Sequence, residues 1–194
     1  SVFVGGFNLD TAIDVCADDR LPAESIVDAV AGLVAKSVVS RETDDLRARF
    51  RLLESIREYG WGKLSPRERD AMNTALLNWC AEIMVDSATH WYGPDQVAKA
   101  AVVQENRGNI RAALDFAMAS RDDEAPTATA THALGSARFL WACGISGREH
   151  RMWLTKALDL PHACDRNKAR MFAVLALLQT LHGDHESAAF SIQR

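Results

Sequence analysis

The sequence predicts a mainly α-helical chain with a single β-hairpin near its start. Two observations carry this prediction. Apolar and basic residues alternate over Arg47–Leu52, which is typical of a half-buried strand with a basic outer face. After Leu52 no alternating pattern returns, and apolar residues instead recur at helical spacing through the rest of the chain.

The elements around this strand follow in the order of a winged-helix domain, which we predict over residues 1–64. They are, in order, helices over about Thr11–Ala17 and Pro22–Ala35, a β-branched strand at Lys36–Arg41, a polar turn at Glu42–Leu46, the Arg47–Leu52 strand and a helix over about Glu54–Leu64. The inward positions of these elements should converge on one small core. Those positions are Phe7, Leu33, Phe50, Leu52, Ile56 and Tyr59.

A strong helix start follows at Ser65. Ser65 can cap the helix, Pro66 suits its first position, and Glu68 can complete a capping box. We therefore predict a second, all-α domain over residues 65–194 that is truncated at its C-terminal end. Its predicted helices run from Ser65 to about Trp91 and over Asp95–Gln104, Asn106–Ser120, Thr127–Cys143, Gly147–Leu158 and about Arg166–Leu181.

Two stretches of this second domain echo each other and suggest a tetratricopeptide-like array of helical hairpins. Phe172, Gly183 and Ala188 are spaced like the aromatic and small positions of a tetratricopeptide unit, and the segment from Gly147 to Trp153 partly repeats them. The offset between Gly147 and Gly183 is 36 residues, close to the period of about 34 for such units.

No catalytic constellation is visible, so we expect neither an enzyme nor a cofactor or metal site in this chain. Neither a phosphate-cradling GxxxxGK[ST] loop nor a GxSxG elbow is present. His182-Gly183-Asp184-His185 lacks a third metal ligand at helical spacing. The four separated cysteines are expected to be reduced, buried thiols of a cytoplasmic protein, and no apolar run is long enough to enter a membrane.

The basic strand supplies the candidate contact residues, which are Lys36, Arg47, Arg49 and Arg51. These side chains could contact either DNA phosphates or a neighbouring protein domain. The helix that would enter a DNA groove, Pro22–Ala35, carries Glu24 and Asp28 and no Lys or Arg. Residues 1–64 hold eight Lys and Arg against eleven Asp and Glu, a net charge of −3, so we favour a protein-facing winged helix.

Several blocks resemble one bacterial family. SVFVGGFNLDTAIDVCA, IVDAVAGLVAKSVV and RFRLLESIREYG resemble the winged-helix segment of large ATP-dependent transcriptional regulators, the LuxR-type and antibiotic-regulator-type members of the STAND class. ENRGNIRAALDFA at Glu105–Ala117 resembles the E-x-x-N-L-R-A-A-L-x-W-A helix that follows in that family, although Glu105 lies one residue further from Asn109 and Phe116 replaces the Trp.

The resemblance implies a switch in which this chain is a fragment of a longer regulator. A nucleotide-binding domain would precede residues 1–64 in the same chain, and ATP or ADP would bind there rather than here. Residues 1–64 would relay its state to residues 65–194, the start of a sensor that takes a protein or small-molecule inducer. A separate effector domain would contact DNA. Two alternatives stay open, a winged-helix module that binds DNA itself and a helical-repeat scaffold for protein interactions without switching.

Overall fold

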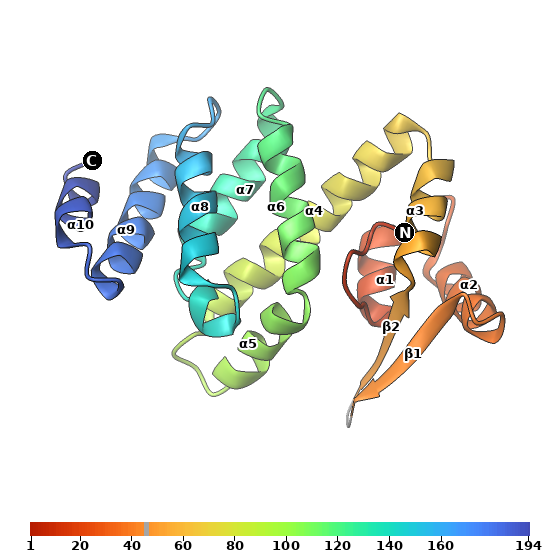
Figure 1. Cartoon of the computed structure of the whole chain (residues 1–194). Helices are drawn as coiled ribbons and strands as arrows, with labels where there is room; N and C mark the ends of the chain where they lie inside the picture. The colour runs from red at the N-terminus through yellow and green to blue at the C-terminus, as the bar shows by residue number, and fades with distance from the viewer. Residues whose placement is uncertain (45–46) are drawn as a thin grey trace.

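The computed structural model of this chain describes residues 1–44 and 47–194, and for residues 43, 44 and 47 it describes the backbone alone. Within these limits the predicted fold class, mainly α-helical with one small hairpin, is confirmed. The helices are α1 (Leu9–Cys16), α2 (Ala23–Ala35), α3 (Glu54–Lys63), α4 (Pro66–Thr89), α5 (Gln96–Glu105), α6 (Arg107–Ala119), α7 (Glu124–Ser136), α8 (Gly147–Leu158), α9 (Asp165–Leu181) and α10 (His185–Ile192). Figure 1 shows an elongated molecule with α1–α3 and the hairpin at one end and α10 at the other.

The hairpin pairs β1 (Val39–Asp44) with β2 (Arg47–Leu52) in antiparallel register, with Val39 opposite Leu52. β1 begins three residues later than predicted because the chain first closes the end of α2: Val38 donates its backbone N–H to the Leu33 carbonyl, and Ser37 adopts a positive φ of 57°. It also extends into the predicted turn, of which Asp45 and Leu46 lie outside the described residues.

The backbone at Phe7 pairs with this hairpin and extends the sheet by one short β-bridge. Phe7 and Phe50 exchange two backbone hydrogen bonds of 2.9 and 2.7 Å. Their rings lie 5.9 Å apart, and Phe7 also stacks on Phe3 at 4.7 Å. Phe3 and Phe7 are each 4% exposed, so this aromatic row forms the centre of the small core.

Two of the six predicted core positions are wrong. Leu33 is 38% exposed and Tyr59 is 68% exposed, with the Lys63 ammonium 4.9 Å from the Tyr59 ring. α2 packs mainly against α1 and β1, and its buried residues are Ile26 and Val30. α3 turns Ile56, Gly60 and Trp61 inward rather than Tyr59. Helical spacing identified an apolar stripe but not which side of it the neighbouring elements cover.

α4 begins as predicted. The Ser65 hydroxyl accepts from the Glu68 N–H and the Glu68 carboxylate accepts from the Ser65 N–H, which completes the capping box, and Pro66 occupies the first turn. Leu76, Leu77, Cys80 and Met84 along its inner side are each 1% exposed. The predicted inward face of α6 is also buried. The domain boundary at Ser65 coincides with this helix start, and the division into two domains stays a prediction.

The helix predicted over Thr127–Cys143 is wrong in its extent. The Asp123 carboxylate accepts from the Ala125 N–H, so α7 starts at Glu124, and Pro126 sits in the first turn, where its missing N–H costs nothing. α7 then ends at Ser136. The Phe139 ring stacks on Trp91 at 4.5 Å, and a short 3-10 turn, η1 (Leu140–Cys143), leads into α8.

The C-terminal helices form an antiparallel pair. Gly183, at a φ of 77°, makes the turn between α9 and α10, and Leu175, Ala176 and Ala188 are buried between neighbouring helices. The tetratricopeptide-like interpretation stays a prediction. None of the helices in the described part of the chain combines the length and apolar character that a bilayer crossing requires.

The prediction of buried thiols holds for two of the four cysteines. Cys80 and Cys143 are buried, Cys16 is half-buried, and Cys164 is exposed just before α9, where it serves as the N-cap position. Burial raises the pKa of the Cys80 thiol well above its usual range. This thiol is therefore a neutral core group rather than a reactive one.

His150 is the least expected group in the helical core. Its imidazole is 0% exposed, and neither ring nitrogen has a hydrogen-bond partner among the described residues. Burial lowers the pKa of His150 from 6.5 to about 4, because the charged imidazolium would lose its hydration. The neutral ring thus fills space beside Trp153, which is also buried.

The aromatic row makes a stability prediction. Phe7→Ala should lower the free energy of unfolding by about 3–5 kcal/mol, since it empties a fully enclosed ring site. Phe50→Ala should cost less because Phe50 is only half-buried. Tyr59→Ala is the matched control and should cost less than about 0.5 kcal/mol. Urea denaturation followed by circular dichroism measures all three, and a Tyr59→Ala loss equal to that of Phe7→Ala would contradict the packing described.

His150 makes a pH prediction. The unfolded chain binds this proton below about pH 6.5 and the folded chain only near pH 4, so stability is complete at neutral pH and falls as the pH drops through this window. The loss attributable to His150 should approach roughly 3 kcal/mol at pH 4. His150→Leu should remove that part of the acid sensitivity, which denaturation midpoints at several pH values would reveal. Identical pH profiles for the two proteins would refute the assignment.

Candidate functional site

The candidate site lies where the N-terminal segment and β2 meet the α5–α6 connection. The extended chain from Val4 to Gly6 crosses the start of α6 at Gly108. A Cβ on Gly108 would lie 3.5 Å from both the Cα and the backbone nitrogen of Gly5, and a Cβ on Gly5 would lie 3.9 Å from the Gly108 Cα. The two backbones are therefore in van der Waals contact at these glycines.

Asn109 is the central side chain of this junction. Its carbonyl oxygen accepts from the backbone N–H groups of Val4 at 3.0 Å and Gly5 at 3.1 Å. Its amide nitrogen donates to the Gly6 carbonyl and to the Asn106 side-chain oxygen, each at 3.2 Å. Asn109 is 0% exposed, so all four hydrogen-bonding positions of its amide are used inside the protein.

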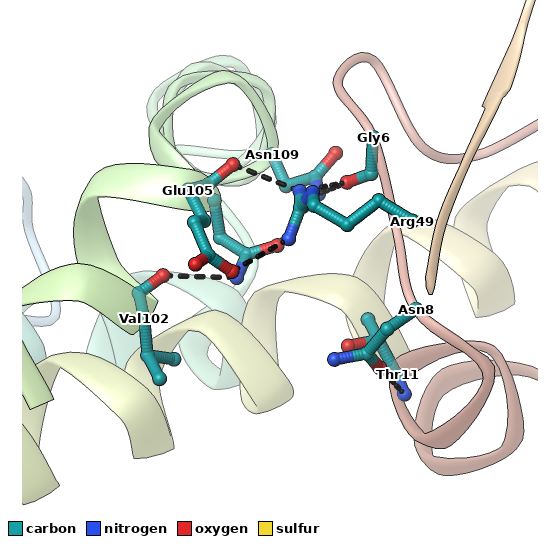
Figure 2. Close-up of polar contacts among 8 residues, drawn as sticks. Gly6, Asn8, Thr11, Arg49, Val102, Glu105 and Asn109 are labelled. Carbon is teal, nitrogen blue, oxygen red and sulfur yellow. Dashed lines mark hydrogen bonds and ion pairs between the residues drawn. The ribbon is translucent and has the colours of Figure 1, made fainter. Parts of the chain in front are cut away.

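Arg49 reaches the same point from β2. Figure 2 shows its guanidinium between the Gly6 carbonyl and Glu105 at the end of α5. Nη1 donates to the Glu105 carboxylate at 2.9 Å, while Nη2 donates to the Gly6 carbonyl at 2.8 Å and to the Glu105 backbone carbonyl at 3.0 Å. The Gly6 carbonyl therefore accepts from both Arg49 and Asn109. A cation at the C-terminal carbonyls of α5 also matches the negative end of that helix dipole.

Two further features fix the geometry. Asn106 separates α5 from α6, close to the predicted division between these two helices, and its side-chain amide donates back to the Val102 carbonyl at 2.9 Å. Gly6 lies close to Arg49, because a Cβ at this position would lie 3.2 Å from Nε and Nη2 and would require the guanidinium to shift by a few tenths of an ångström. Trp79 of α4 adds a separate link, with its indole N–H donating to the Asp14 carboxylate of α1 at 3.2 Å.

The four candidate residues from the sequence are placed differently from one another. Arg49 has a side chain only 16% exposed and lies in the junction. Arg51 is 58% exposed and pairs loosely with Glu42 of β1 at 3.6 Å. Lys36 is exposed at the end of α2. The backbone of Arg47 belongs to β2, and its side chain lies outside the described part of the structure.

Sequence reasoning did not assign a role to Gly6, Asn106, Gly108 or Asn109. The available signal was Asn109 itself, a polar residue on the buried face of α6 next to Ile110 and Ala113. A buried amide needs partners for its donors and acceptors, and those partners lie 103 to 105 positions away in the sequence. Local periodicity cannot identify such distant partners.

The solvent-exposed face of α2 differs from the junction in its chemistry. Glu24 and Asp28 of α2 are exposed, together with Val27, which is 39% exposed. This face therefore presents carboxylates and an apolar side chain to solvent. A carboxylate-bearing face repels a phosphate backbone, so α2 lacks the chemistry of a helix that enters a DNA groove.

Comparison with known proteins gives one partial similarity. No family model matches the chain, and no solved structure matches it significantly. Proteins from Mycobacterium bovis and from two strains of Mycobacterium tuberculosis, each provisionally named an HTH-type transcriptional regulator, are 42% identical to it over 62 residues. The match covers 32% of this chain but only 7% of each relative's length. The chain is thus similar in part to transcriptional regulators.

The junction predicts that its own side chains contribute more to stability than the exposed Arg51 of β2. Asn109→Ala should cost about 2–4 kcal/mol of stability, since it leaves the Val4 and Gly5 N–H groups without their acceptor and removes one of the two donors to the Gly6 carbonyl. Arg49→Ala should cost about 1–2 kcal/mol, and the control Arg51→Ala less than about 0.5 kcal/mol because its ion pair is exposed. Hydrogen exchange should accelerate at the Val4 and Gly5 amides in Asn109→Ala. Unchanged protection of those amides would contradict the geometry.

Proposed function

We propose that this chain is the relay and the first part of the sensor of a cytoplasmic bacterial transcriptional regulator. Residues 1–64 would receive the state of a nucleotide-binding domain elsewhere in the same protein. Residues 65–194 would carry the inducer-responsive helices, a tetratricopeptide-like array. The observation that supports this assignment best is the junction of Gly6, Arg49, Glu105 and Asn109, which couples the two halves through named hydrogen bonds.

The contacts of the junction are typical of an interface that can open rather than of a permanent core. Its central contacts are hydrogen bonds and one ion pair, and the Glu105 side chain is 47% exposed, so water can replace these partners when the halves separate. A cleft of about 260 Å³ beside it, between α1 and the α4–α5 helices, leaves room for movement. An interface of this kind supports two arrangements that differ by a few kcal/mol, which is what a ligand-driven switch requires.

The distribution of charge favours a protein partner for the outer face of residues 1–64. Glu24 and Asp28 face solvent on α2, and Arg49 is turned toward the junction rather than outward. The exposed apolar residues Val27 and Leu33 on the same helix suit contact with another protein domain. The partial similarity to regulators named as HTH-type supports a place in transcription control, and we assign DNA contact to a separate effector domain.

The relay proposal predicts distinct effects for two arginines in the intact regulator. Arg49→Ala should change the rate of ADP release, or its response to inducer, several-fold because it loosens the coupling junction. Arg51→Ala is the matched control on the same strand face and should behave like the wild type. Release of a fluorescent ADP analogue measures both. Wild-type exchange in Arg49→Ala would argue against the relay.

The competing DNA-binding function is tested on the 194-residue chain itself. We expect no preference between a promoter duplex and a random duplex at about 150 mM salt, since α2 lacks the Arg, Lys, Asn or Gln side chains that recognise base edges. Any residual affinity should be weak and should disappear as salt is raised. Nanomolar, sequence-specific binding that is lost on changing α2 would favour the winged-helix DNA-binding module.

A further inference from the structure

A groove lies between α4, α7 and α9, away from the junction. Its volume is about 540 Å³, within the range of roughly 300–1,000 Å³ that small-molecule sites occupy. α4 contributes Val85 and Ala88, and α9 contributes Val174 to its apolar surface. α4 packs against α7, and α7 packs against α9, so these walls belong to the packed helical array.

Each wall is one helical face. The lining residues of α4 are Val85, Ala88 and Thr89, those of α7 are His132, Gly135 and Ser136, and those of α9 are Arg170, Ala173 and Val174. Each set follows the spacing i, i+3 and i+4, which places its members side by side on one face of the helix. Gly135 lets α9 approach α7, because a Cβ there would lie 3.0 Å from the Arg170 Cβ.

The polar lining of this groove is basic. Arg138 and Arg170 line it together with His132 and Ser136, and no carboxylate belongs to the lining. Neither arginine takes part in an ion pair within the described part of the chain. The Arg138 guanidinium lies 5.9 Å from the Phe139 ring, and Phe139 stacks on Trp91, so an aromatic cluster holds this cation at the rim.

We propose that this groove binds a small organic anion, a carboxylate or phosphate ester carried on an apolar body. Arg138 and Arg170 would hold the anionic group by charge-assisted hydrogen bonds, with His132 and Ser136 as further donors. The apolar body would lie on Val85, Ala88 and Ala173. The site rests on the proposed function only in that it would be the inducer site of the sensor half.

The same face of α4 continues beyond this groove. An adjoining hollow of about 590 Å³ shares Val85, Thr89 and His132 with it and is lined at its far part by Glu82 and Asp86. Asp86 is already paired with Lys99, so the charge changes sign along the path from the arginines to Glu82. A ligand longer than the first groove would place hydroxyl or ammonium groups, rather than a second anion, beside α4 there.

Titration of the 194-residue chain, followed by amide NMR shifts, tests the proposal with benzoate and phenyl phosphate as probes. Both should bind saturably, with shifts at groove-lining amides such as those of His132 and Ala173, and more weakly at high salt. Arg170→Gln and Arg138→Gln should each raise the dissociation constant about tenfold. Arg170→Lys should retain most of the binding, and Arg166→Gln, an exposed arginine of α9 outside the groove, should leave it unchanged.

Neutral benzamide and inorganic phosphate separate the two parts of the proposed ligand. Each should bind at least about tenfold more weakly than phenyl phosphate, because one lacks the charge and the other the apolar body. Equal binding of benzamide, equal binding of inorganic phosphate, an equal loss in Arg166→Gln or no saturable binding at all would each overturn the proposal. This titration detects no nucleotide exchange, so its failure and a failure of the Arg49→Ala experiment are distinguishable.

Discussion

The carbonyl oxygen of Gly6 is the point on which the arrangement of this molecule depends. It accepts from Arg49 of the hairpin and from Asn109 of α6, so three segments that are remote in sequence are fixed by one acceptor. The neighbouring N–H groups of Val4 and Gly5 bind the other side of the same asparagine. A separate hydrogen bond from Trp79 of α4 to Asp14 of α1 joins the same two parts of the chain nearby.

Burial explains why Asn109 can carry this role and an exposed side chain cannot. A fully enclosed amide loses its water partners, so leaving any of its four positions unused costs stability. The hydrogen bonds of Asn109 therefore fix the orientation of the segments that they join as well as holding them together. Arg49 donates a charge-assisted hydrogen bond to the same Gly6 carbonyl, but its side chain remains partly accessible to solvent. Water can therefore replace this contact more easily than that of Asn109.

Local elements were predictable from the sequence wherever a short-range physical rule decided them. The capping box at Ser65, the bounds of α8 and the buried face of α6 follow from spacing and capping chemistry alone. Leu33 and Tyr59 were assigned to the core wrongly because a helix pattern does not say how many neighbours cover its apolar stripe. α7 ends at Ser136, earlier than predicted, and the Phe139 ring that follows stacks on Trp91, a residue remote in sequence.

Arg49 is the residue of the candidate site that the sequence predicted. Arg49 stood out as part of a basic strand face, but nothing in the strand distinguishes it from Arg51, whose side chain faces solvent. The backbones of Gly5 and Gly108 are in van der Waals contact although 103 positions separate them in the sequence. Such a contact has no local signature, since its cause lies in packing between distant segments.

The separation of Val4–Gly6 from Asn109 has a consequence for the order of folding during synthesis. The backbone of Val4–Gly6 cannot find its partner until α6 has also left the ribosome, more than one hundred residues later. Until then the two strands of the hairpin can pair with each other, but the backbone that precedes Phe7 has no Asn109 side chain to bind. Contacts of such long range form slowly because a large loop must close first. The segment Val4–Gly6 should therefore reach its final position only after α6 has folded.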